Sequence, residues 1–104
     1  MAHPKSKHDR IIRSLENRLK NTRRYDLIQS TTEYNIHGRH GECDLFAIRG
    51  RYALILEIKT HDSVKSRTKV YQQLKKDSKW IKSRYGIDRV FKFYAYSGSL
   101  EWIL

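Results

Sequence analysis

The sequence is poor in three things: cysteine, acidic residues and long apolar runs. The single cysteine, Cys43, excludes an intramolecular disulfide framework, and it fits the reducing cytoplasm of a cell, or of a host cell if the gene is viral. No apolar run, signal sequence or lipidation motif points to a membrane partner. Repeats, interdomain linkers and low-complexity stretches are also absent, so we expect one domain that buries roughly 60–65% of its unfolded surface.

Positive charge is what the chain has in excess. Lysine and arginine number 22 against 11 aspartate and glutamate, which gives a net charge of +11. Such an excess attracts polyanions and makes their binding sensitive to salt. The composition therefore predicts a polyanionic partner: a nucleic acid, with an anionic membrane surface as the rival.

A predicted β-hairpin in the middle of the chain carries the candidate site. Two apolar runs, 43–49 and 52–58, flank Gly50-Arg51, a pair that suits a type II′ turn. That turn sets Asp44 opposite Glu57, with Cβ atoms roughly 4.5–5.5 Å apart. Two carboxylates on an apolar hairpin repel each other, and a divalent cation bound between them would replace this repulsion with attraction to the cation.

Mg²⁺ suits this pair because it binds few carboxylates and keeps several waters. Lys59 shares a strand face with Glu57 and would hold or help to deprotonate the attacking water, or stabilise developing charge. In the alternative interpretation Glu57 and Lys59 only pair with neighbours, Lys59 with Glu42. Zinc at His37, His40 and Cys43 is disfavoured, because strand alternation places His40 on the opposite face from the other two.

Asp44, twelve intervening residues and then Glu57-Ile58-Lys59 resemble the signature of the PD-(D/E)XK nuclease superfamily. Gly41-Glu42-Cys43-Asp44 stands where many members have Pro-Asp. Spacing, length and charge are similar to archaeal-type Holliday junction resolvases, and the segment also resembles a small bacterial nuclease-like family of unknown role. The resemblance spans residues 8–97.

The resemblance implies a restriction-endonuclease-like fold and Mg²⁺-dependent cleavage, with Mn²⁺ as a substitute. It implies metal ligands from Asp44, Glu57, the backbone carbonyl of Ile58 and Glu16, direct or through water, and catalysis by these acids with Lys59. A four-way junction has near two-fold symmetry, so paired nicks imply a C2 homodimer.

A first helix is predicted to follow a basic flexible tail, residues 1–7, and to run to about residue 23. Ser6-x-x-Asp9 resembles a capping box, and Ile12, Leu15 and Leu19 recur at helical spacing. Glu16 lies at the margin of that stripe, where it would be a third acid over the hairpin. Glu33 competes for that role, and an ion pair with Lys20 is the simpler alternative for Glu16.

The remaining pattern predicts further elements in chain order: a strand at 25–34, a flexible loop at 35–41, a basic loop at 60–68, a helix at 66–85 stopped by Gly86, a strand at 90–96, and a short strand at 100–104 with an apolar dimer surface. This gives an α/β or α+β fold of order α-β-β-β-α-β-β, with a central mixed sheet flanked by helices. The nuclease domain is expected to span residues 8–104. Asp77 falls within the inward arc of the second helix and needs a partner.

Several polar and basic side chains near the hairpin are candidates for contact with nucleic acid. They are Arg39, His40, Lys65, Arg67, Lys69, Gln73 (or Gln72) and Lys76. A solvated surface or a core-edge position is the alternative for each.

The sequence thus predicts a Mg²⁺-dependent DNA endonuclease, with a junction resolvase as the leading form and a nickase or a single-strand or end nuclease as others. A nucleic-acid-binding module without turnover is the alternative from another class. An accessory subunit that needs a partner chain is a third.

Overall fold

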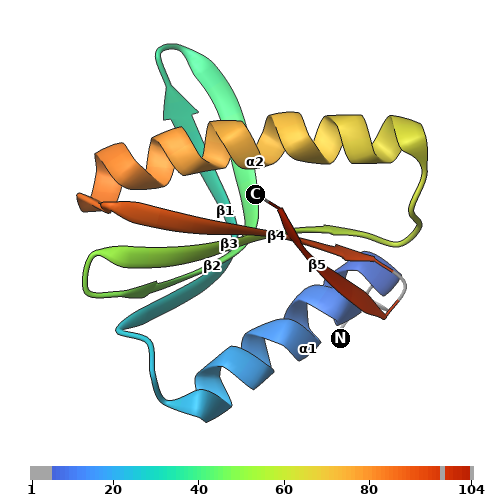
Figure 1. The fold of residues 1–104 in the computed structure, drawn as a ribbon, viewed down its shortest axis with the longest axis horizontal. Helices are drawn as coiled ribbons and strands as arrows, with labels where there is room; N and C mark the ends of the chain where they lie inside the picture. Colours follow the sequence, from blue (N-terminus) through green and yellow to red (C-terminus); the bar gives the residue numbers. More distant parts are fainter. Residues whose placement is uncertain (1–5, 97, 104) are drawn as a thin grey trace, which may run out of the picture.

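The computed structural model describes residues 6–96 and 98–103, which form two helices around a five-stranded sheet (Figure 1). In chain order the elements are α1 (Lys7–Thr22), β1 (Leu27–Ile36), β2 (Arg39–Arg49), β3 (Tyr52–Lys59), α2 (Val64–Tyr85), β4 (Arg89–Tyr96) and β5 (Ser99–Ile103). The predicted fold class, a mixed sheet flanked by helices in the order α-β-β-β-α-β-β, is confirmed.

The strands lie side by side in chain order, and only β3 and β4 run parallel. A parallel neighbour requires a crossover, which α2 supplies. Figure 1 shows α2 on one face of the sheet and α1 on the other. Each face therefore has its own apolar cluster: one contains Val70, Leu74 and Ile81 of α2, and the other contains Ile12 of α1.

Helix α1 begins as its sequence predicts. The Ser6 hydroxyl accepts a hydrogen bond from the Asp9 backbone N–H at 3.1 Å, which satisfies one free donor of the first turn. Leu15 and Leu19 pack with buried Ile12 against the sheet. The predicted tail was wrong at its end, because Ser6 caps the helix and Lys7 is helical; residues 1–5 lie outside the described residues.

The central hairpin has the predicted turn and register. Gly50 has φ +57°, the left-handed backbone that the first position of a type II′ turn needs, and pairing runs from Arg49–Tyr52 to Leu45–Leu56. The predicted flexible loop at 35–41 was wrong. Strands β1 and β2 extend through it, and only His37 and Gly38, with φ +51° and +76°, form the turn.

The second half of the chain follows the prediction with shifted boundaries. Helix α2 begins at Val64 because the Ser63 hydroxyl accepts from the Ser66 backbone N–H at 3.0 Å, so the predicted basic loop at 60–68 is shorter. The helix ends at Gly86, with φ +65°, as expected. Strand β4 has the predicted faces. Ser97 and Leu104, of the predicted turn and last strand, lie outside the described residues.

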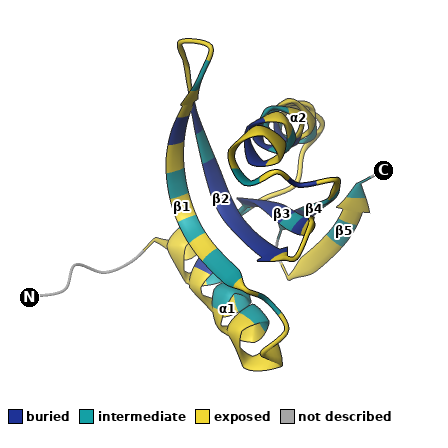
Figure 2. Cartoon of the chain, turned by 90° about the vertical axis from the view of Figure 1, so that its left-hand side faces the viewer, coloured by how far each residue is buried: buried dark blue, intermediate teal, exposed yellow. Residues whose placement is uncertain are grey.

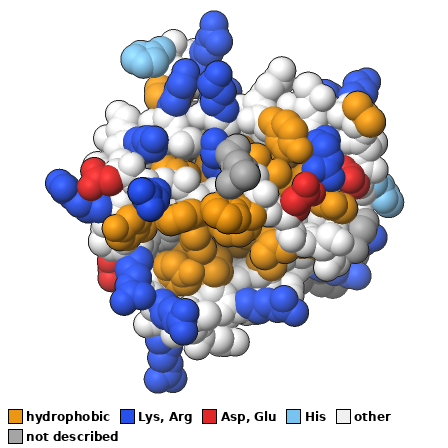
Figure 3. All heavy atoms as spheres, viewed as in Figure 1, with side chains coloured by type: hydrophobic (Ala, Val, Ile, Leu, Met, Phe, Trp, Pro, Cys, Tyr) orange, Lys and Arg blue, Asp and Glu red, His pale blue; other side chains and the backbone are white. Residues whose placement is uncertain are grey.

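Strand β5 is an edge of the sheet and carries exposed apolar side chains. Leu100 and Trp102 are 56% and 58% exposed. Hydrophobic side chains gather in the middle of the face that Figure 3 shows, with lysines and arginines around them. No helix of the described residues has the length and apolar character to cross a membrane.

The two strands of the outer hairpin change faces together at Thr31 and Asp44. Thr31 has φ +48°, and the pairing of β1 with β2 is interrupted at this position without a change of register. Cys43 packs on the α2 face, whereas Leu45, two residues later, packs on the α1 face. The left-handed residue breaks strand alternation, and Asp44 lies at the break.

Burial is concentrated in the middle of the sheet, as Figure 2 shows for β2 and β3. Aromatic rings fill the α2 face. Trp80 stacks on Tyr34 with ring centroids 4.5 Å apart, and Phe46 meets the Trp80 ring edge-on at 5.6 Å. Trp80 is therefore part of the core rather than a platform for a nucleic-acid base.

Candidate active site

Asp44 lies where β2 and β3 separate. Backbone pairing between the two strands ends at Leu45 and Leu56, one step short of the predicted Asp44–Glu57 pair. Beyond that point the Asp44 side chain replaces the backbone of β2 as hydrogen-bond partner: its Oδ2 accepts from the Ile58 backbone N–H at 2.9 Å. The carboxylate is only 5% exposed, so this bond both satisfies a buried donor and fixes the acid.

Glu57 is the second buried acid, 6% exposed, on the α2 face of β3. Its Oε2 has no hydrogen-bond partner among the described residues. Burial raises the pKa of Glu57 strongly, and the adjacent Asp44 carboxylate raises it further. The predicted meeting of the two acids is confirmed, although it is made by side chains beyond the end of the strand ladder.

Lys59 shares the α2 face with Glu57, as predicted, and its positive charge lowers the pKa of that acid. The two side chains line an open cavity of about 410 Å³ between β3 and α2. The other residues that line this cavity are Lys69, Gln72, Gln73 and Lys76. The candidate residues of β3 and α2 that were predicted from the sequence thus lie together around Glu57.

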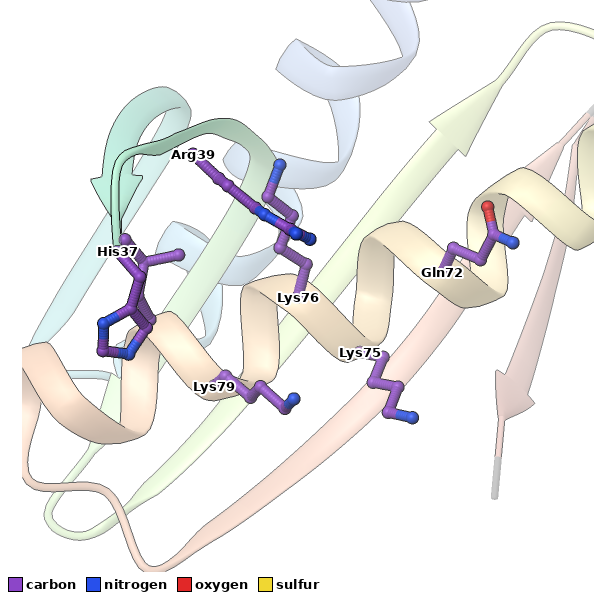
Figure 4. Close-up of a pocket in the computed structure, with 7 residues that line it drawn as sticks. His37, Arg39, Gln72, Lys75, Lys76 and Lys79 are labelled. Atoms are coloured by element: carbon purple, nitrogen blue, oxygen red, sulfur yellow. The ribbon is translucent and has the colours of Figure 1, made fainter.

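A second, more basic cavity of about 620 Å³ continues from the first, because Gln72 and Lys76 line both. Figure 4 shows Arg39 reaching from the β1–β2 hairpin toward Lys76, with Lys75 and Lys79 on either side of Lys76 along α2. The Lys76 ammonium donates to the His40 backbone carbonyl, which ties the hairpin to the helix. We call the two cavities together the basic groove.

The Gln73 side chain is held by two hydrogen bonds, one to β2 and one within α2. Its Nε2 donates to the Glu42 carbonyl at 2.8 Å and to Asp77 Oδ1 at 2.7 Å. Tyr34 donates to the same Asp77 oxygen at 2.5 Å, so the partner that Asp77 required is a tyrosine of β1. Burial raises the pKa of Asp77 to about 6. This network holds β2 against α2 beside the groove.

Arg67 does not face the groove. Its guanidinium lies 2.8 Å from Asp62 and 2.9 Å from Glu101, and it also packs over the Tyr94 ring. The hydrogen bond to Asp62 is the main reason that the pKa of Arg67 is raised. Its predicted role in binding nucleic acid stays a prediction, and in this arrangement its charge is already matched by two acids. Lys65 is exposed on the first turn of α2.

Neither candidate for the third acid joins the Asp44–Glu57 pair. Glu16 accepts from the Ser30 hydroxyl at 3.3 Å and lies 3.5 Å from the Lys20 ammonium, the simpler of the two predicted arrangements. The Glu33 side chain is 70% exposed and lies 3.9 Å from His40. The structure therefore assigns Glu16 to an ion pair and Glu33 to the surface.

His8 was missed as a candidate, yet it reaches the site from the first turn of α1. Its Nε2 donates to the Ile58 carbonyl at 2.8 Å and lies 3.4 Å from Asp44 Oδ2. A signal was present in the sequence, because His8 precedes Ile12 by four residues and so shares the buried face of the helix.

The residues present fit a divalent cation. Two adjacent buried carboxylates, one with an unpartnered oxygen, leave negative charge that a cation would neutralise, and the Ile58 carbonyl lies beside them. Oxygen donors of this kind are those that Mg²⁺ prefers. In the described part of the chain, no group of three or more His, Cys, Asp or Glu side chains is already gathered as a metal cage.

Comparison with known proteins adds a structural likeness. No protein-family model matches the chain, and no curated protein does so. The crystal structure of SSO0001 aligns with 92% of this chain at 20% sequence identity and a TM-score of 0.49. The alignment covers 48% of SSO0001, so this chain spans about half the length of that protein.

The metal-free protein should become more stable when Glu57 is replaced by glutamine. The free Glu57 oxygen costs about 1–3 kcal/mol, and a Glu57→Gln amide can donate to Asp44 instead of repelling it. Because the folded-state pKa of Glu57 is raised above its unfolded value of about 4.3, wild-type stability falls as pH rises above that value. Urea unfolding with EDTA at pH 5 and pH 8 should show the larger gain at pH 8.

Glu33→Gln is the matched control for that comparison, since its side chain is exposed. It should change the free energy of unfolding by less than about 0.5 kcal/mol at either pH. A Glu57→Gln protein less stable than wild type at pH 8 would mean that the two acids do not repel in the folded chain.

Proposed function

We propose that this chain is a metal-dependent nuclease that hydrolyses phosphodiester bonds in DNA. The observation that carries the proposal is the pair of adjacent buried acids, Asp44 and Glu57, with Lys59 beside them at one end of the basic groove. A structural core rarely places two unmatched carboxylates together, because each raises the cost of ionising the other. Perturbed acids that border a cleft are typical of functional sites.

The divalent cation, Mg²⁺ or Mn²⁺, would supply charge stabilisation and Lewis acidity at the scissile phosphate. Asp44 and Glu57 would hold it together with the Ile58 carbonyl. The Asp44 carboxylate is oriented for this by the Ile58 N–H, which occupies only one of its lone pairs. Lys59 keeps an ammonium group on the groove side of Glu57, where it can orient the attacking water or stabilise negative charge on phosphate.

The basic groove supports a polyanionic substrate. Arg39, Lys75, Lys76 and Lys79 line one continuous depression that ends at Lys59. Phosphates bound along it would pass from the β1–β2 hairpin to the acids, and such contacts position a backbone without reading sequence. This is the behaviour expected of a nuclease that selects shape.

Within this activity we propose a structure-selective enzyme similar to archaeal-type junction resolvases. Support comes from the Asp44-x12-Glu57-x-Lys59 spacing and the net charge of +11. Paired nicks in a four-way junction require a dimer, and exposed Leu100 and Trp102 on edge strand β5 offer an apolar surface for a second copy. A nickase or an end nuclease would use the same acids.

The direct test is cleavage by the purified protein. Labelled four-way junction, duplex and single-stranded DNA are incubated with the protein in EDTA, Mg²⁺ or Mn²⁺, and products are resolved on denaturing gels. We expect nicks only with a divalent cation and most on the junction. If each substrate is bound but none is cut with either cation, the result favours the second candidate function, a nucleic-acid-binding module of the same fold. The basic groove is the observation that supports this alternative.

A further inference from the structure

On the α1 side, the candidate site contains a histidine, His8, that has no role yet in the acid pair or the basic groove. His8 Nε2 lies 2.8 Å from the Ile58 carbonyl oxygen and 3.4 Å from Asp44 Oδ2. Both of these oxygens are ligands in the proposed cation site. An imidazole that contacts two ligands of one site lies at the site's edge, within reach of the same ion.

The second ring nitrogen of His8 also has a suitable neighbour. Nδ1 lies 3.9 Å from Asp9 Oδ1, on the next residue of the helix. A metal-bound histidine commonly directs its other N–H to a carboxylate, which fixes the ring and the tautomer. Nε2–H donates to the Ile58 carbonyl. Ligation would need the proton on Nδ1, and Asp9 would have to move closer than 3.9 Å to accept it.

We infer that His8 is the nitrogen ligand of this cation site, and that it makes the site select Co²⁺ over Mg²⁺. The inference rests on the proposed function for the site itself. Imidazole suits the later divalent metals, whereas carboxylates and carbonyls alone suit Mg²⁺ and Mn²⁺. It also explains why Glu16 is absent from the pair: the first turn of α1 contributes the ligand, two turns before Glu16.

The test measures metal binding without nucleic acid. Calorimetric titration with Co²⁺, Mn²⁺ and Mg²⁺ is carried out on wild type, His8→Gln and His61→Gln. A His8→Gln side chain can still donate to the Ile58 carbonyl, so the tether between α1 and β3 is kept while the aromatic nitrogen is lost. His61 is exposed between β3 and α2 and serves as the matched control.

We expect His8→Gln to weaken Co²⁺ binding by at least about tenfold and Mg²⁺ binding by less than about threefold, with His61→Gln unchanged. A Co²⁺ affinity within about twofold of wild type in His8→Gln would overturn the inference, and the proposed nuclease would stand on its oxygen ligands. If wild type binds none of the three cations and cuts no DNA, the proposed function fails with it.

A measurement on the wild-type chain keeps the inference testable should His8→Gln not fold. Substoichiometric Mn²⁺ broadens the NMR signals of nuclei close to it. The His8 imidazole signals should disappear before those of His37 in the β1–β2 turn, His40 on β2 and His61 between β3 and α2. Equal broadening of all four sets would contradict ligation by His8.

Discussion

Asp44→Asn should abolish cation-dependent cleavage and leave DNA binding almost unchanged. We expect a loss of at least about 10³-fold in cleavage rate, which corresponds to about 4 kcal/mol of transition-state stabilisation. Asparagine presents an oxygen that can still accept from the Ile58 N–H, so the junction of β2 and β3 is preserved. What is lost is the negative charge that would hold the cation.

Binding is measured separately, by fluorescence anisotropy in EDTA, because the basic groove contributes to it without the cation. The dissociation constant of Asp44→Asn should stay within about threefold of wild type. Asp88→Asn is the matched control, since Asp88 is 63% exposed and pairs with Arg51 far from the groove. If Asp44→Asn still cuts within tenfold of wild type, the acid pair is not the catalytic centre.

The register of the central hairpin could be predicted because two independent signals agree. Alternating apolar residues fix which face is buried, and Gly50 fixes where the chain reverses. Together they bring Asp44 and Glu57 near each other before any tertiary contact is considered. The core stripe of α1 was predictable for the same reason, since helical periodicity is a local property.

The α1 side chain that lies over Asp44 could not be predicted from periodicity. A helical wheel gives the angle of a side chain around the axis but not the height at which the helix crosses the sheet. His8 and Glu16 are eight residues apart, or about 12 Å along α1, and only contacts with β1 and β3 decide which of them lies over Asp44. The structure places His8 there and leaves Glu16 with Ser30.

The switch of faces at Asp44 also lacked a signal. It depends on the left-handed backbone of Thr31, a residue type that seldom adopts it. Likewise Tyr34, which donates to Asp77, and Glu101, which pairs with Arg67, lie 43 and 34 residues away in sequence, so these two contacts depend on sheet order rather than local pattern. In each case a long-range contact decided the role of a charged side chain.

Gly41→Ala should be the most destabilising small substitution near the site. A Cβ at this position would lie 2.4 Å from Cζ of Tyr34, well inside van der Waals contact. The ring cannot move away cheaply, because it stacks on Trp80 and its hydroxyl donates to Asp77. Overpacking plus loss of that hydrogen bond should cost about 2–4 kcal/mol in the free energy of unfolding.

The nearby Gly38→Ala provides the control. Gly38 has φ +76° but open space around its Cα, so alanine there should cost only about 1 kcal/mol of backbone strain. A double-mutant cycle with Tyr34→Ala separates the causes: if the Tyr34 ring is the obstacle, Gly41→Ala should cost less than about 0.5 kcal/mol in that background. An undiminished cost would place the obstacle elsewhere. The close approach of the Tyr34 ring would then not be the reason for a glycine in the Gly41-Glu42-Cys43-Asp44 motif.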